Sequence, residues 1–239
     1  SSDVCSSDLD LNRELEDLGV TAFGEIEIVG DFEEGAVAVA QANGIAGIES
    51  NTVMFGWANS AARQAAALRV IERLSMLGKS AVICRVSPTG LKSEPHTIHV
   101  WWGGLQENGD MLVLFAHLLS QHPEWRRAEI TINSIATTPM MQTHTLDSLK
   151  RLTRAARIDA KLDVTIKPPH TKVQDMIVER SENADVVLMG LRRIVIGDEQ
   201  GYADRLTSLS QGLGNVLFVR NAGIFRGQLL GSTEKPADS

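Results

Sequence analysis

The stretch Thr97–Ile135 constrains the fold of this chain more than any other, because it carries two strand patterns separated by a helix pattern. Its first run alternates as a strand does, placing Ile98, Val100 and Trp102 on one face and His99 and Trp101 on the other. Two glycines then stop the run. A second strand is predicted over Ala128–Ile132. Since a parallel pair of strands needs a crossover helix of this length, the stretch predicts one βαβ unit.

The helix between these strands should begin with Asp110 as its N-cap and end at Pro123. Apolar residues recur there at helical spacing: Met111, Leu114, Phe115, Leu118 and Leu119. We therefore expect these five side chains to face the core.

The rest of the chain alternates between the same two patterns. Further strands are predicted at Gly24–Val29, in an apolar run ending near Gly56-Trp57, and at Ser80–Val86, Lys161–Lys167, Asp185–Leu191 and Asn215–Arg220. Further helices are predicted at Leu11–Leu18, Phe32–Ala42, Ala61–Leu77 and Thr143–Arg157, from Thr171 or Lys172 to Asn183, and over about Gly201–Gln211. This order predicts an α/β fold, with a layered, mostly parallel sheet and helices on both faces.

Charge and composition divide the chain into segments. Residues 1–34 hold eleven acidic side chains against the single base Arg13, whereas the remaining residues carry a small positive excess. We interpret residues 1–9 as an artificial scar or a disordered segment, 10–34 as an acidic lead-in, 35–222 as the α/β domain and 223–239 as a loose tail. An overall charge of −7 argues against a nucleic-acid partner, which would need a strongly basic face.

Cysteine content and hydropathy bound the cellular setting. The two cysteines, Cys5 and Cys84, are far apart and do not suggest a disulfide framework, so a reducing compartment is expected, with Cys84 buried in an apolar run. Uninterrupted apolar runs are too short to span a bilayer, and the first residues lack the pattern of a signal peptide.

Several motifs in the same order resemble the C-terminal cytosolic domain of cation–chloride cotransporters, members of the amino acid–polyamine–organocation permease superfamily. These motifs are the Trp101-Trp102 strand with its glycine turn, the leucine-rich helix, the Gln121–Arg126 segment QHPEWR, the Gly44–Trp57 segment and Arg157–Ala160. The resemblance covers about Gly35 to Arg220. The short loop after Leu191 resembles bacterial or archaeal members, so control by phosphorylation is not expected.

The resemblance implies a fold like that of universal stress proteins. It also implies a regulatory domain on the cytoplasmic face of the membrane that pairs two subunits of a symporter for chloride with sodium or potassium. Its partners would be its own transmembrane domain, outside this sequence, and a second copy of itself. An amino-acid permease with a similar tail is an alternative.

A stand-alone universal-stress-like nucleotide sensor is the alternative from another class. Such proteins carry a second glycine shortly after the first in their phosphate loop, but Gly190 is followed by Leu191-Arg192-Arg193, and Gly231-Ser232 lies far beyond. Arg192 and Arg193 follow a strand, where α/β sheets bind ligands, but we expect them to be solvated loop charges.

No catalytic, cofactor-binding or metal-binding residue is predicted, and the chain is expected not to be an enzyme. His96 and His99 should point to opposite faces of an extended segment, and His117 and His122 should lie on a helix surface and at its end. Trp102 is expected in the core and Trp101 beneath a helix. The basic helix face of Lys150, Arg151, Arg154 and Arg157 is a solvated face that can also approach anionic lipid.

Overall fold

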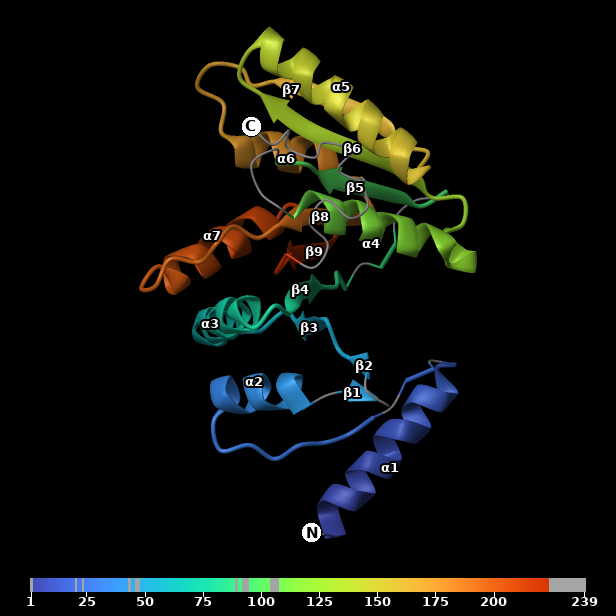
Figure 1. Ribbon diagram of the computed structural model, residues 1–239, viewed down its shortest axis with the longest axis vertical. Helices are drawn as coiled ribbons and strands as arrows, with labels where there is room; N and C mark the ends of the chain where they lie inside the picture. The colour runs from blue at the N-terminus through green and yellow to red at the C-terminus, as the bar shows by residue number, and fades with distance from the viewer. Residues whose placement is uncertain are drawn as a thin grey trace, which may run out of the picture.

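The computed structural model describes residues 2–19, 21–22, 24–42, 44–45, 48–88, 90–91, 95–103 and 108–223. Its centre is a seven-stranded sheet in the order β3-β4-β9-β8-β5-β6-β7 (Figure 1). The strands are β3 Thr52–Gly56, β4 Ser80–Arg85, β5 Thr97–Trp101, β6 Glu129–Ala136, β7 Lys161–Ile166, β8 Val186–Gly190 and β9 Asn215–Arg220. All neighbours are parallel except β4 and β9, which pair antiparallel. The predicted α/β class is confirmed.

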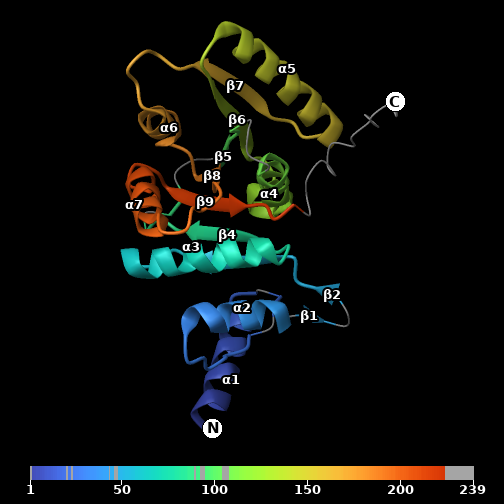
Figure 2. The same cartoon turned by 60° about the vertical axis from the view of Figure 1, so that its left-hand side comes forward.

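Helices cover both faces of this sheet, as Figure 2 shows. The helices α3 Ala61–Met76, α6 Val173–Ser181 and α7 Glu199–Ser210 pack on one face around Phe218, and α4 Gly109–Gln121 and α5 Pro139–Ala156 pack on the other around Ile132. A 3-10 turn, Pro123–Trp125, follows α4. None of the helices in the described ranges is long and apolar enough to cross a membrane. The sheet therefore buries two apolar layers, which explains why its central strands carry near-continuous apolar runs.

The N-terminal part differs from its prediction. Helix α1 spans Ser2–Asp17, so the short helix predicted at Leu11–Leu18 is the second half of a longer one. The strand predicted at Gly24–Val29 is absent from the described residues there. Instead, the Asn12 side chain donates to the Gly24 carbonyl at 3.0 Å and accepts from its N–H at 2.9 Å. A two-stranded hairpin, β1 Gly44–Ile45 and β2 Ile48–Glu49, comes before β3.

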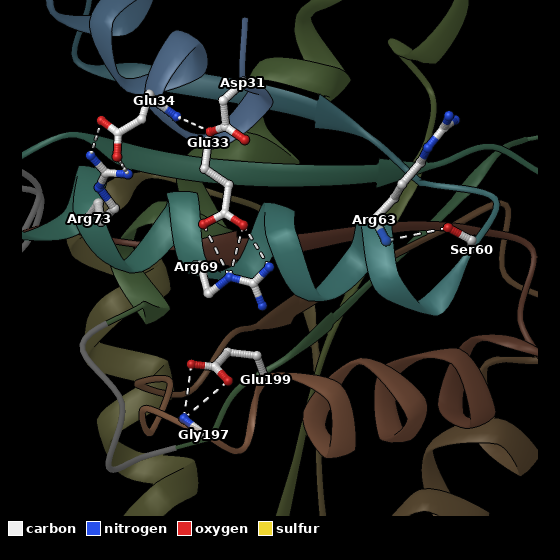
Figure 3. Close-up of polar contacts among 9 residues, drawn as sticks. All are labelled: Asp31, Glu33, Glu34, Ser60, Arg63, Arg69, Arg73, Gly197 and Glu199. Carbon is white, nitrogen blue, oxygen red and sulfur yellow. Dashed lines mark hydrogen bonds and ion pairs between the residues drawn. The ribbon is translucent and has the colours of Figure 1, made fainter.

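Helix α2, Phe32–Ala42, lies on α3 and is held there by two ion pairs and a small apolar cluster. Figure 3 shows Glu33 reaching across to Arg69, at 2.6 Å, and Glu34 to Arg73, at 3.0 Å. Asp31 caps α2 as predicted, because its carboxylate accepts the Glu34 N–H at 3.0 Å. The domain boundary predicted at residue 35 therefore falls inside a helix that packs on the domain.

Helix α4 buries the predicted face in part: Met111 is buried, and Phe115 and Leu119 pack partly buried against the core. Its N-cap is Asn108 instead of Asp110, and its buried side chains are Met111, Leu112, Val113 and Ala116, while Leu118 is 53% exposed. Because the helix is apolar on most of its circumference, periodicity alone fits more than one face, and packing over β5 and β8 selects among them.

Candidate functional site

A cleft opens at the carboxyl ends of β5 and β8, where the chain order reverses. From β5 the chain continues to β6 and β7 on one side of the sheet, and it later returns to β8 and β9 on the other. Open α/β sheets bind their ligands at such a reversal. The cleft has a volume of about 550 Å³, within the roughly 300–1,000 Å³ typical of small-molecule sites. It is therefore the candidate functional site of this domain.

Trp101, the last residue of β5, and Trp102, which follows it, line the cleft from opposite faces of the sheet. Trp101 is the last strand residue and is 8% exposed within the α3–α6–α7 core, whereas Trp102 follows the strand and is half-buried. The prediction that the two point to opposite faces is confirmed, since they join different clusters. Trp102 packs against the core on the α4–α5 face as expected, but it is only partly buried and lies one residue beyond the end of the strand.

A buried hydroxyl holds Trp101 in place. The Trp101 Nε1–H donates to Ser181 Oγ at 3.0 Å, and His99 Nδ1 lies 3.0 Å from the same oxygen. Ser181 Oγ has two lone pairs and one proton, so besides accepting from Trp101 it can either donate to His99 Nδ1 or accept from it. In both arrangements the imidazole is neutral, with one ring proton. Burial lowers the pKa of His99 and so favours this neutral form. Ser181 is fully buried and positions a ring; it has no access to a substrate.

Asn108, just before α4, is hydrogen-bonded to the residues that follow β8 and β9, at the edge of the cleft. Its amide donates to the Leu191 carbonyl at 2.7 Å, and its Oδ1 accepts the Asn221 N–H at 2.8 Å. A Cβ placed on Gly190 would lie 2.8 Å from the Asn108 amide nitrogen, so this glycine admits the asparagine side chain. The space above Gly190 is therefore occupied by the protein itself.

The loop after β8 is closed by a cluster of Arg192, Asp198, Tyr202 and Arg205. Asp198 pairs with Arg192, and with Arg205 at 2.6 Å. The Arg192 guanidinium lies 4.3 Å from the Tyr202 ring centre, and the Tyr202 hydroxyl accepts the Arg192 N–H at 3.0 Å. Hydrogen bonds from Arg205 and Arg192 lower the pKa of Asp198, and burial raises that of Tyr202. Arg192 is therefore engaged within the protein.

Arg193 also has a partner, because it lies 3.4 Å from Glu72 on α3 while remaining 80% exposed. The expectation of purely solvated loop charges thus holds in part for Arg193 and was wrong for Arg192. Two cationic side chains among the described residues line the cleft: Arg205 and Lys167, which directly follows β7. Lys167 Nζ donates to the carbonyls of Pro168, at 3.4 Å, and Thr171, at 3.1 Å.

The remaining predicted residues lie elsewhere. Buried His96 lies 3.8 Å from Asp185 and stacks near Trp125, and His122 is exposed after α4. Cys84 is half-buried instead of fully buried, and its burial raises the pKa of the thiol. The exposed basic residues of α5 lie away from the cleft, and Gly231-Ser232 falls outside the described residues. Within those residues no three metal-ligating side chains come together.

Sequence reasoning missed four residues of this site: Asn108, Lys167, Ser181 and Tyr202. The position of Asn108 just before α4 could be read from the sequence, but its side chain makes no cap bond and reaches Leu191 and Asn221 instead, which no local pattern indicates. The other three come from separate helices and strands, and no local pattern connects them.

Comparison with solved structures identifies the class of fold. No family model matches the chain. A universal stress protein from Archaeoglobus fulgidus superposes with a TM-score of 0.54 over 89% of this chain and 74% of its own, at 14% identity. The fold is thus like that of universal stress proteins, as predicted.

Two further matches, one in structure and one in sequence, are both to cation–chloride cotransporters. The cytoplasmic domain of a prokaryotic cation chloride cotransporter superposes with a TM-score of 0.69, over 92% of this chain and 81% of its own, at 16% identity. In sequence, the chain is 24% identical over 153 residues to potassium/chloride cotransporter 3 of Caenorhabditis elegans, a match that covers 61% of this chain and 14% of that protein. The predicted resemblance to cation–chloride cotransporters is confirmed.

Proposed function

We propose that this chain is a cytosolic regulatory domain of a cation–chloride cotransporter, attached to a membrane part that moves chloride with sodium or potassium. The observation that carries the proposal is that sequence and fold comparisons point independently to the same kind of protein. The cotransporter domain also has a higher TM-score than the universal stress protein. The ion path would lie in the membrane part, so the domain acts on transport without catalysis.

Transport by the complete protein tests this proposal. We expect rubidium or sodium uptake into proteoliposomes that depends on chloride and is lost when gluconate replaces it. Deleting residues 35–222 should change the uptake rate or the amount of transporter at the membrane, while the variant Met140→Ala, at an 83% exposed side chain, should change neither. Uptake of an amino acid without chloride would instead identify the permease alternative.

We further propose that the domain pairs with a second copy through a two-fold axis, the commonest closed symmetry. Membrane attachment would raise the effective concentration of the domain to about the millimolar range, so the isolated domain can associate weakly and still pair in the transporter. Sedimentation at millimolar protein should reveal dimers. A monomer there, together with no cross-linking in the membrane protein, would leave no pairing role. The basic α5 face is the proposed contact for anionic lipid.

The nucleotide-sensor alternative predicts that the domain binds ATP, whereas the cotransporter proposal predicts that it does not. A phosphate loop needs backbone N–H groups free to approach the phosphates, whereas here Asn108 covers Gly190 and the Arg192 N–H donates to Tyr202. We therefore expect calorimetry to detect no micromolar binding of ATP. Saturable ATP binding would favour the sensor over the cotransporter domain.

A further inference from the structure

We propose that the cleft at the carboxyl ends of β5 and β8 binds a small organic monoanion with an apolar body, of the class of medium-chain carboxylates. The proposal concerns the cleft alone and does not depend on the transport function.

The walls of the cleft determine the apolar body. Side chains from both faces of the sheet surround it, and many are hydrocarbon or aromatic, among them Trp101, Trp102, Ile135, Ile177, Leu206 and Phe218. A ligand that fills this space removes apolar surface from water, which contributes roughly 25 cal/mol for each Å² buried. A polar body such as a sugar or a nucleobase would instead leave its donors and acceptors facing hydrocarbon, which is unfavourable.

The charges on the cleft determine the anionic group. Lys167 Nζ has carbonyl partners, and no carboxylate within the described part of the chain pairs with it. Arg205 also lines the cleft, and its cluster with Arg192 and Asp198 keeps one net positive charge, because one carboxylate faces two guanidiniums. A carboxylate placed near Lys167 would form an ion pair with the ammonium, and the two neutral carbonyls do not supply that opposite charge.

The same contacts argue against a polyphosphate. Phosphate groups at the end of a strand are held by backbone N–H donors, and here Asn108 fills the space above Gly190. The Arg192 N–H donates to the Tyr202 hydroxyl at 3.0 Å. A single carboxylate needs fewer donors than a triphosphate, so one lysine and the half-neutralised arginine pair suit it better.

The test is a calorimetric titration of the full chain with sodium decanoate, kept below the concentration at which it forms micelles. We expect saturable binding with one site per chain, accompanied by a change in tryptophan fluorescence because Trp101 and Trp102 line the cleft. Decanol, which has the same body without the charge, should bind at least tenfold more weakly.

Two substitutions locate the site. Lys167→Gln should weaken decanoate binding roughly tenfold, whereas Lys172→Gln, at an exposed lysine outside the cleft lining, should leave it unchanged. Ile177→Trp should abolish binding by filling the cleft, with circular dichroism confirming that the variant is folded. Equal affinity in the two lysine variants, no saturable binding by the parent chain, or undiminished binding to folded Ile177→Trp would each overturn the proposal.

Discussion

Replacing Trp101 with alanine should be among the most destabilising single changes in this domain. The indole is 8% exposed and packs among helices α3, α6 and α7, and its Nε1–H donates to Ser181 Oγ at 3.0 Å. Truncating a buried tryptophan costs about 3–5 kcal/mol, and the lost hydrogen bond adds roughly 1 kcal/mol. This loss is a large fraction of the ~5–15 kcal/mol by which domains are stable.

Urea unfolding followed by far-ultraviolet circular dichroism measures the effect, since fluorescence would change with the removed ring itself. For a chain of this size, a loss of 1 kcal/mol lowers Tm by about 2–4 °C, so Trp101→Ala should lower Tm by roughly 10–20 °C. Trp101→Phe keeps an aromatic ring and removes the indole N–H, and should cost about 1–2 kcal/mol.

Trp102→Ala and Met140→Ala complete the comparison. Trp102 is half-buried, so its truncation should cost less, about 1–3 kcal/mol, and the 83% exposed Met140 should change stability by less than about 0.5 kcal/mol. If Trp102→Ala destabilised the domain as much as Trp101→Ala, the two rings would not be buried in the order described. The reasoning about where β5 ends would then be refuted.

Three further predictions concern other contacts. Burial lowers the pKa of His99, so as the pH falls the unfolded chain binds a proton at this residue before the folded chain does. The free energy of unfolding should therefore decrease as the pH drops below about 6.5, and His99→Gln should reduce this decrease when unfolding is measured across the pH range. Gly109→Ala should cost about 1–3 kcal/mol in urea unfolding because the new methyl overlaps the Trp102 ring, whereas Gly103→Ala, with open space around it, should cost less. Arg69→Ala should lower stability by up to about 1 kcal/mol at low salt, and less in 1 M salt, where its half-exposed ion pair is partly screened.

The sequence by itself determined the order and nature of most elements. Strand β9 spans Asn215–Arg220, the predicted range, and the helix predicted at Ala61–Leu77 is α3, capped by Ser60. These patterns are readable because side-chain period and capping depend on neighbours a few residues away. The alternation at Gly24–Val29 has the same period, yet no strand forms there, because a strand also needs a partner.

Tertiary structure alone decided the pairing of the strands and the contents of the cleft. Strand β9 enters between β4 and β8 and runs antiparallel to β4, a choice that no local pattern encodes. Asn108, Lys167 and Tyr202 are each more than thirty residues from the next, and the fold brings them to the lining of one cleft. Which strands pair over long range depends on which buried surfaces fit one another. That fit is a property of the packed layers and not of any short stretch of sequence.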